Sequence, residues 1–134
     1  MLIKRQVLVK SFVTEDLKKD LIERFNKLIE LSEKRISEIV SEEKKLLLTA
    51  PTLEPAYLQA VKNKIKEQKE EEERIKENLI KERENIKLLK DGEFYLHGVV
   101  EGFVDVNIGD DFWKKIQETE IILRDGKVVE IRNE

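Results

Sequence analysis

The apolar side chains of the first thirteen residues are divided between two alternating faces. Ile3, Val7 and Val9 fall on one face, whereas Leu8 and Phe12 fall on the other. A two-residue period rich in β-branched side chains predicts a strand, here with apolar positions on both faces.

Two long heptad patterns follow this strand. Residues 15–48 and 55–90 place apolar side chains at alternating steps of three and four, which predicts two long helices. Thr14 is expected to cap the first helix, because its hydroxyl can accept a hydrogen bond from an orphan backbone N–H group. Pro51 ends the first helix, and Pro55 suits the first turn of the second.

The two heptads fit an antiparallel hairpin in one register. Apolar positions face each other when their residue numbers sum to 104, which places the turn at residue 52. The facing pairs are Phe25 with Leu79, Ile29 with Ile75, Ile39 with Ile65 and Leu46 with Leu58. Ser32 then faces Glu72 within a polar hairpin centre. That centre is either a solvated stretch held by ion pairs or a polar layer that fixes the register or seats a partner.

The last third of the chain has the pattern of β-structure. Residues 93–108 are rich in apolar side chains, with glycines that permit a bend or bulge. Residues 120–124 and 127–132 flank an Asp-Gly pair, which is a strong signal of a β-hairpin. Because a helical hairpin returns the chain to its start, the N-terminal strand is expected to join these strands.

These elements predict an α+β fold: a long antiparallel helical hairpin, or coiled coil, on a small antiparallel β head. Residues 1–14 and 91–134 are expected to form the head, and residues 15–90 the hairpin, with its tip near residues 49–55. A head of this size buries little of its own surface. Since its strands also have apolar residues on both faces, we expect a homo-oligomer that assembles through the head.

Composition narrows the class of protein. The 134 residues include no Cys, which excludes a disulfide framework and thiolate metal sites. No apolar run is long enough to span a bilayer, and the N-terminus lacks the apolar segment of a signal peptide. We therefore expect a cytoplasmic protein with no membrane partner. Charged residues make up 41% of the chain, and the abundance of Lys and Glu predicts thermal stability.

The sequence contains no recognisable catalytic, metal-binding or nucleotide-binding motif. The chain has a single His, His97, and no glycine-rich nucleotide-binding loop. The acidic segment 105–116 resembles a calcium loop, but Gly109 and Ile116 stand where an oxygen ligand and a Glu are required. The sequence thus predicts no enzyme, with no catalytic residues and no metal or cofactor site.

An apolar cluster surrounds the expected turn of the hairpin. Its members are Leu47, Leu48, Leu53 and Tyr57. These side chains either cap the end of the hairpin or form a contact surface, because exposed apolar patches mark binding partners.

A small basic group lies in the N-terminal strand, where Lys4, Arg5 and Lys10 are a candidate contact for RNA. Nucleic-acid binding usually depends on an extended basic surface. The whole chain has a net charge of −3, and its C-terminal third is acidic, which disfavours direct binding to a duplex.

Three segments carry a family resemblance: VLVKSFVTE at residues 7–15, GVVEGFVDVNIGD at residues 98–110 and EIILRDGKVVEIR at residues 120–132. They resemble the YlqD-like family of uncharacterised bacterial proteins. The order of a strand, a charged helical pair and a β tail is also similar over the whole chain. The resemblance implies no established activity and no functional residues. Genes of that family tend to lie near genes for a small-subunit ribosomal protein and for ribosome and tRNA maturation factors.

These patterns lead to three hypotheses about function. The first is a non-enzymatic coiled-coil interaction protein with an unidentified protein partner. The second is an accessory factor in ribosome assembly or RNA processing that associates with ribosomes or RNA. The third is a prefoldin-like holdase, since prefoldin-type chaperones also have paired helices on a β platform, although in a different chain order.

Overall fold

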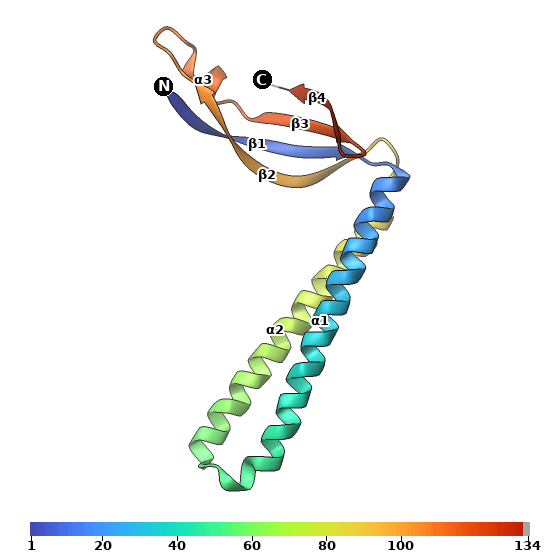
Figure 1. Cartoon of the computed structure of the whole chain (residues 1–134), viewed down its shortest axis with the longest axis vertical. Coiled ribbons are helices and arrows are strands. Elements are labelled where there is room, and N and C mark those ends of the chain that lie inside the picture. The colour runs from blue at the N-terminus through green and yellow to red at the C-terminus, as the bar shows by residue number, and fades with distance from the viewer. Residues whose placement is uncertain (133–134) are drawn as a thin grey trace. The chain divides into compact units, whose positions relative to one another are not determined.

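A computed structural model describes residues 1–132 of the chain. Its elements are β1 (Leu2–Phe12), α1 (Glu15–Thr49), the 3-10 helix η1 (Ala50–Thr52), α2 (Pro55–Lys87), β2 (Phe94–Asp105), α3 (Phe112–Lys115), β3 (Thr119–Arg124) and β4 (Lys127–Arg132) (Figure 1). The predicted α+β class, with long paired helices and a sheet built from both ends of the chain, is confirmed.

The chain divides into two compact units. One consists of Met1–Lys19 together with the chain from Leu89 onward, and the other is Asp20–Leu88. The first unit contains the sheet and is called the head below, and the second contains the helical hairpin. The sequence placed residues 133–134 in the head, but they lie outside the described residues.

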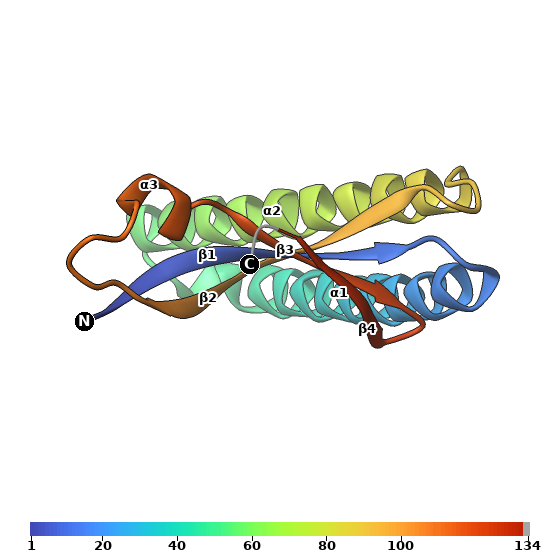
Figure 2. The same cartoon turned by 90° about the horizontal axis from the view of Figure 1, so that it is seen from above.

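In the hairpin, α1 and α2 run antiparallel and lie side by side (Figures 1 and 2). Their buried side chains include Leu21, Ile29, Ser32, Ile65 and Ile86. The hydroxyl of Ser32 lies 3.2 Å from a carboxylate oxygen of Glu72, so the two polar positions meet in the expected register. No helix in residues 1–132 combines the length and apolar character needed to cross a membrane.

The ends of the two long helices follow local signals with one exception. Leu17 donates its backbone N–H to the hydroxyl of Thr14 at 3.1 Å, so Thr14 caps α1 as expected. The second helix was expected to reach residue 90 but ends at Lys87. It stops earlier because the following residues turn back toward β1. Val13 N–H donates to the Glu93 carbonyl at 2.8 Å, and Gly92 supports this turn with a φ of 87°.

The head is a four-stranded sheet in the order β2-β1-β3-β4. β1 pairs antiparallel with β2, and β3 pairs antiparallel with β4. The turn between β3 and β4 contains Asp125 and Gly126, both with positive φ, as a type I′ hairpin requires. The hairpin predicted from the Asp-Gly pair is therefore confirmed.

The expected antiparallel sheet needs one correction, because β1 and β3 are parallel and the sheet is mixed. Val7 pairs with Thr119 and Ser11 with Leu123 in the same direction. After β2 has run against β1, the segment that contains α3 returns the chain before β3 begins. Apolar alternation does not encode the direction of a pair of strands so distant in sequence.

The most buried side chains of the head lie in β1, directly after it, and in β3. They are Val7, Ser11, Val13, Thr119 and Ile122. Ser11 Oγ lies 2.5 Å from His97 Nε2, so the single histidine of the chain is hydrogen-bonded within the sheet.

Candidate functional site

The hairpin tip exposes the apolar cluster that the sequence singled out. Leu48 is 83% exposed, Leu47 and Tyr57 are more than half exposed, and Leu53 is half-buried. Leu58, on the inner side of α2, is also only half-buried. The short turn thus leaves most of the apolar cluster outside the helix pair.

Two grooves lie between the helices next to the tip. The first has a volume of about 320 Å³, and its apolar side chains are Leu46, Leu47 and Ile65. Its basic side chains are Lys62, Lys66 and Lys69.

The second groove has a volume of about 430 Å³ and shares Leu46 and Ile65 with the first. Val61 adds to its apolar lining, and Lys45 and Lys64 are its basic side chains. Because the two grooves share these two side chains, we call both together the tip grooves.

The five lysines of the tip grooves are not paired with acidic side chains of the part of the chain that the structure describes. None of the five makes an ion pair within residues 1–132. Residues 42–69, which include all five groove lysines, contain six lysines and four acidic residues, so this segment has an excess of positive charge. The tip therefore combines exposed apolar side chains with an excess of lysines over carboxylates.

The centre of the hairpin is different. Glu72 has a side chain that is only 17% exposed, and it accepts a hydrogen bond from Ser32 and faces Arg35 Nη1 at 3.8 Å. Lys76 pairs across the helices with Glu33 at 3.4 Å. The hairpin centre therefore contains a polar layer that joins the two helices.

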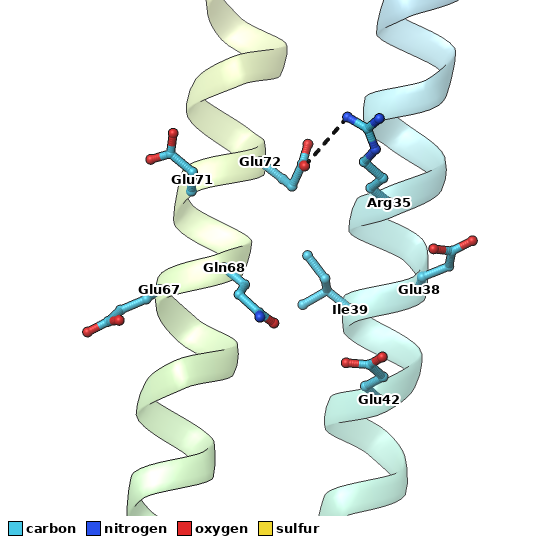
Figure 3. A pocket seen from close by; sticks show the side chains of 8 residues that line it. All are labelled: Arg35, Glu38, Ile39, Glu42, Glu67, Gln68, Glu71 and Glu72. Atoms are coloured by element: carbon cyan, nitrogen blue, oxygen red, sulfur yellow. Dashed lines mark ion pairs between the residues drawn. The ribbon is translucent and has the colours of Figure 1, made fainter.

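A cleft of about 660 Å³ lies beside this polar layer (Figure 3). Figure 3 shows Gln68 and Glu72 pointing toward α1 and Ile39 pointing toward α2, while Glu67 points away from the seam. Most of the other lining side chains are acidic. No group of three or more His, Cys, Asp or Glu side chains that could hold a metal ion occurs among the described residues.

The basic group of the N-terminal strand does not form one patch. Lys4 pairs with Glu101 at 3.4 Å, and Lys10 pairs with Glu120 at 2.8 Å. Arg5 donates to the backbone carbonyl of Lys115 at 3.4 Å. Strand alternation places Arg5 on the face opposite Lys4 and Lys10. The three cations are thus divided between two faces and engaged within the head.

The strand β2 forms one free edge of the sheet. Four of its apolar side chains are more than half exposed: Leu96, Val99, Val100 and Phe103. We call these four residues the β2 edge. Within this 12-residue strand, Glu101 and Asp105 are the only charged residues.

The strand β4 forms the other edge and is shorter and more charged. It spans 6 residues and contains Lys127, Glu130 and Arg132. Arg132 Nε donates to Glu130 at 2.9 Å, and this hydrogen bond lowers the pKa of the Glu130 carboxyl. A register shift interrupts the pairing of β4 with β3, and another interrupts the pairing of β2 with β1. Short length and charge, two features that protect an edge strand from pairing, are what distinguish β4 from β2.

Two of these features were not identified from the sequence. The tip-groove lysines Lys62, Lys66 and Lys69 follow a spacing of four and three residues, which places them on one side of α2. That spacing was visible in the sequence, but the sequence did not show that these lysines form no ion pair within residues 1–132. The β2 edge needed the sheet order, because apolar alternation alone does not say which strand is outermost.

Comparisons with known proteins agree with this architecture. The family model described as YlqD protein matches residues 1–132 of the chain. The structure is similar to the crystal structure of a protein of unknown function from Synechococcus sp. WH 8102, with a TM-score of 0.85 and 19% sequence identity. The alignment covers 98% of this chain and 94% of that chain, and it shows a shared fold. No curated protein matches the sequence.

Proposed function

The chain belongs to the YlqD family, and we propose that it is a non-enzymatic interaction protein whose head joins copies of the chain and whose hairpin tip contacts a partner. The observation that carries this proposal is the location of its exposed apolar side chains. They include the β2 edge in the head and the tip cluster in the hairpin. Exposed apolar patches of this kind are typical of surfaces that bind other macromolecules.

The β2 edge supports pairing with a second copy. An exposed edge strand presents unpaired backbone N–H and C=O groups, and soluble proteins usually blunt it with Lys, Pro or short length. β2 is long and contains neither Lys nor Pro. Antiparallel pairing of two β2 strands about a twofold axis would satisfy these groups and bury Val99 and Phe103. Twofold symmetry is the commonest arrangement of homo-oligomers.

Dimerisation through the head would strengthen the binding of a partner at the hairpin tips. Each copy contributes one hairpin, so a dimer carries two tips. Linked binding sites raise the overall affinity for a partner that has two matching sites, without any new contact. A weak apolar contact at each tip is then enough for stable association.

The RNA-related alternative has less support from the charges. Lys4 and Lys10 are paired with carboxylates, and Arg5, which donates to a backbone carbonyl, lies on the other face of the strand, so the three cations do not form one basic patch. The holdase alternative would use the same exposed leucines at the tip. Affinity capture followed by mass spectrometry separates the three: ribosomal subunits favour an RNA-related role, diverse unfolded proteins favour a holdase, and one defined protein favours the proposed function.

Sedimentation equilibrium tests the proposed assembly. Val99→Lys adds a charge to the β2 edge, and Val129→Lys adds the same charge to β4 at a side chain of similar exposure, 53% against 51%. We expect the unmodified chain and Val129→Lys to sediment as dimers, and Val99→Lys as a monomer.

A mass near 15.8 kDa for the unmodified chain at tens of micromolar would overturn the proposed assembly. So would equal dissociation of the two variants. Far-UV circular dichroism of both variants shows whether the head and hairpin are still folded.

A further inference from the structure

We infer that the tip grooves bind an acidic, amphipathic segment of a partner protein. This inference deepens the proposed function, on which it rests, by naming the chemistry of the partner at the tip. It depends on two features that occur together at this end of the hairpin: an apolar floor and a lysine rim without acidic partners.

The apolar floor is formed by side chains that the helix pair leaves partly uncovered. Leu46 and Ile65 line both grooves, and Leu47 extends the floor toward the tip. Leu47 is 54% exposed, and the neighbouring Leu48 and Tyr57 are also exposed. Apolar side chains of a partner would therefore meet exposed apolar side chains both in the groove and at the tip.

The rim supplies positive charge on both sides of this floor. Lys62, Lys66 and Lys69 line the first groove, and Lys45 and Lys64 line the second. One acidic residue enters each groove, Glu43 in the first and Glu42 in the second, so lysines outnumber carboxylates in both. In residues 1–132 these lysines have no ion pair that would have to break before a partner binds.

The combination favours a peptide over a nucleic acid. A phosphate backbone would use the lysines but would leave the leucine floor without a complement. An amphipathic segment with Glu or Asp beside Leu or Ile uses both features, as in other helix-in-groove complexes. Lys62 to Lys69 spans about 10 Å at 1.5 Å per residue, which matches about two turns of a helical partner.

The experiment measures binding of a fluorescent peptide to the full chain by anisotropy. The probe has about 16 residues of Glu, Leu and Ala, with Leu on one face of the helix. A second peptide has the same composition in a scrambled order without an apolar face. A single-stranded RNA of about the same length is the third probe. All three are measured at about 0.15 M salt, where distant surface charges are screened.

Matched variants distinguish binding in the grooves from a general effect of the protein's net charge. The groove variant combines Lys62→Gln, Lys66→Gln and Lys69→Gln. The control variant combines three exposed hairpin lysines outside the grooves, with the same change in net charge. Its substitutions are Lys27→Gln, Lys34→Gln and Lys81→Gln.

We expect the amphipathic peptide to bind the unmodified chain and the control variant equally. The groove variant should bind about tenfold more weakly, because each exposed ion pair contributes a fraction of a kcal/mol. Leu47→Ser should weaken binding without changing its salt dependence. The scrambled peptide and the RNA should bind more weakly than the amphipathic peptide.

Three results would overturn the inference: equal weakening in the groove and control variants, equal binding of the scrambled peptide, or tighter binding of the RNA. Sedimentation of the same samples separates this inference from the proposed assembly. A monomer that binds the peptide contradicts assembly through the head alone, whereas a dimer that does not bind it contradicts the tip inference alone.

Discussion

The centre and the tip of the hairpin follow the same heptad pattern, but their charged side chains differ in whether they form ion pairs. At the centre, Glu72 is held by Ser32 and Arg35, and Glu33 pairs with Lys76 across the helices. At the tip, leucines are exposed and the groove lysines have no ion pair within residues 1–132. The comparison teaches that charged residues in a two-helix seam can pair and join the helices, whereas lysines beside an open groove make no ion pair among the described residues.

The largest expected effect is on the buried seam. Ile86 is 2% exposed, so Ile86→Ala should lower the free energy of unfolding by about 2–5 kcal/mol through lost burial and a cavity. Urea unfolding followed by circular dichroism measures the change. Leu31→Ala is the control, because Leu31 belongs to the same hairpin but is exposed. Equal costs for the two substitutions would contradict the assignment of the seam.

The next effect concerns the polar layer of the centre. Ser32 is 1% exposed, and Ser32→Ala removes the hydroxyl that donates to Glu72. Leaving this largely buried carboxylate without that donor should cost about 1–3 kcal/mol of unfolding free energy. Ser37→Ala, at an exposed position of α1, should change stability little. If Ser32→Ala is neutral, the centre is a solvated stretch and not a layer that joins the helices.

A smaller effect is expected from the exposed ion pair between Lys76 and Glu33. A double-mutant cycle with Lys76→Ala and Glu33→Ala should give a coupling of about 0.2–1 kcal/mol, since the pair is partly solvated. The coupling should decrease in high salt. A coupling that is independent of salt would show that the two side chains interact through packing instead.

The smallest effect on stability is expected at the tip. Leu48 is 83% exposed, so Leu48→Ser should change the free energy of unfolding by less than about 0.5 kcal/mol. If the exposed leucines of the tip take part in binding, the acidic amphipathic peptide should nevertheless bind more weakly, because Leu48 is the most exposed of them. A large loss of stability would indicate that the tip leucines cap the hairpin and are not a contact surface.

Much of the hairpin could be read from the sequence because its contacts are periodic and its turn is local. The heptads and two prolines predicted the helices and their turn, and the constant sum of residue numbers placed Ser32 opposite Glu72. The Asp-Gly pair predicted the β3-β4 hairpin for the same reason, since residues 125 and 126 adopt the positive φ values that the turn requires.

The tertiary structure alone decided the features that depend on distant pairing. Strand alternation did not show that β1 and β3 are parallel or that β2 is an outer strand. It also did not show that Glu101 and Glu120 pair with Lys4 and Lys10, or that the groove lysines make no ion pair with any residue from 1 to 132. The physical reason is that a local pattern determines which side chains share a face, whereas the partners across that face come from residues about a hundred positions away.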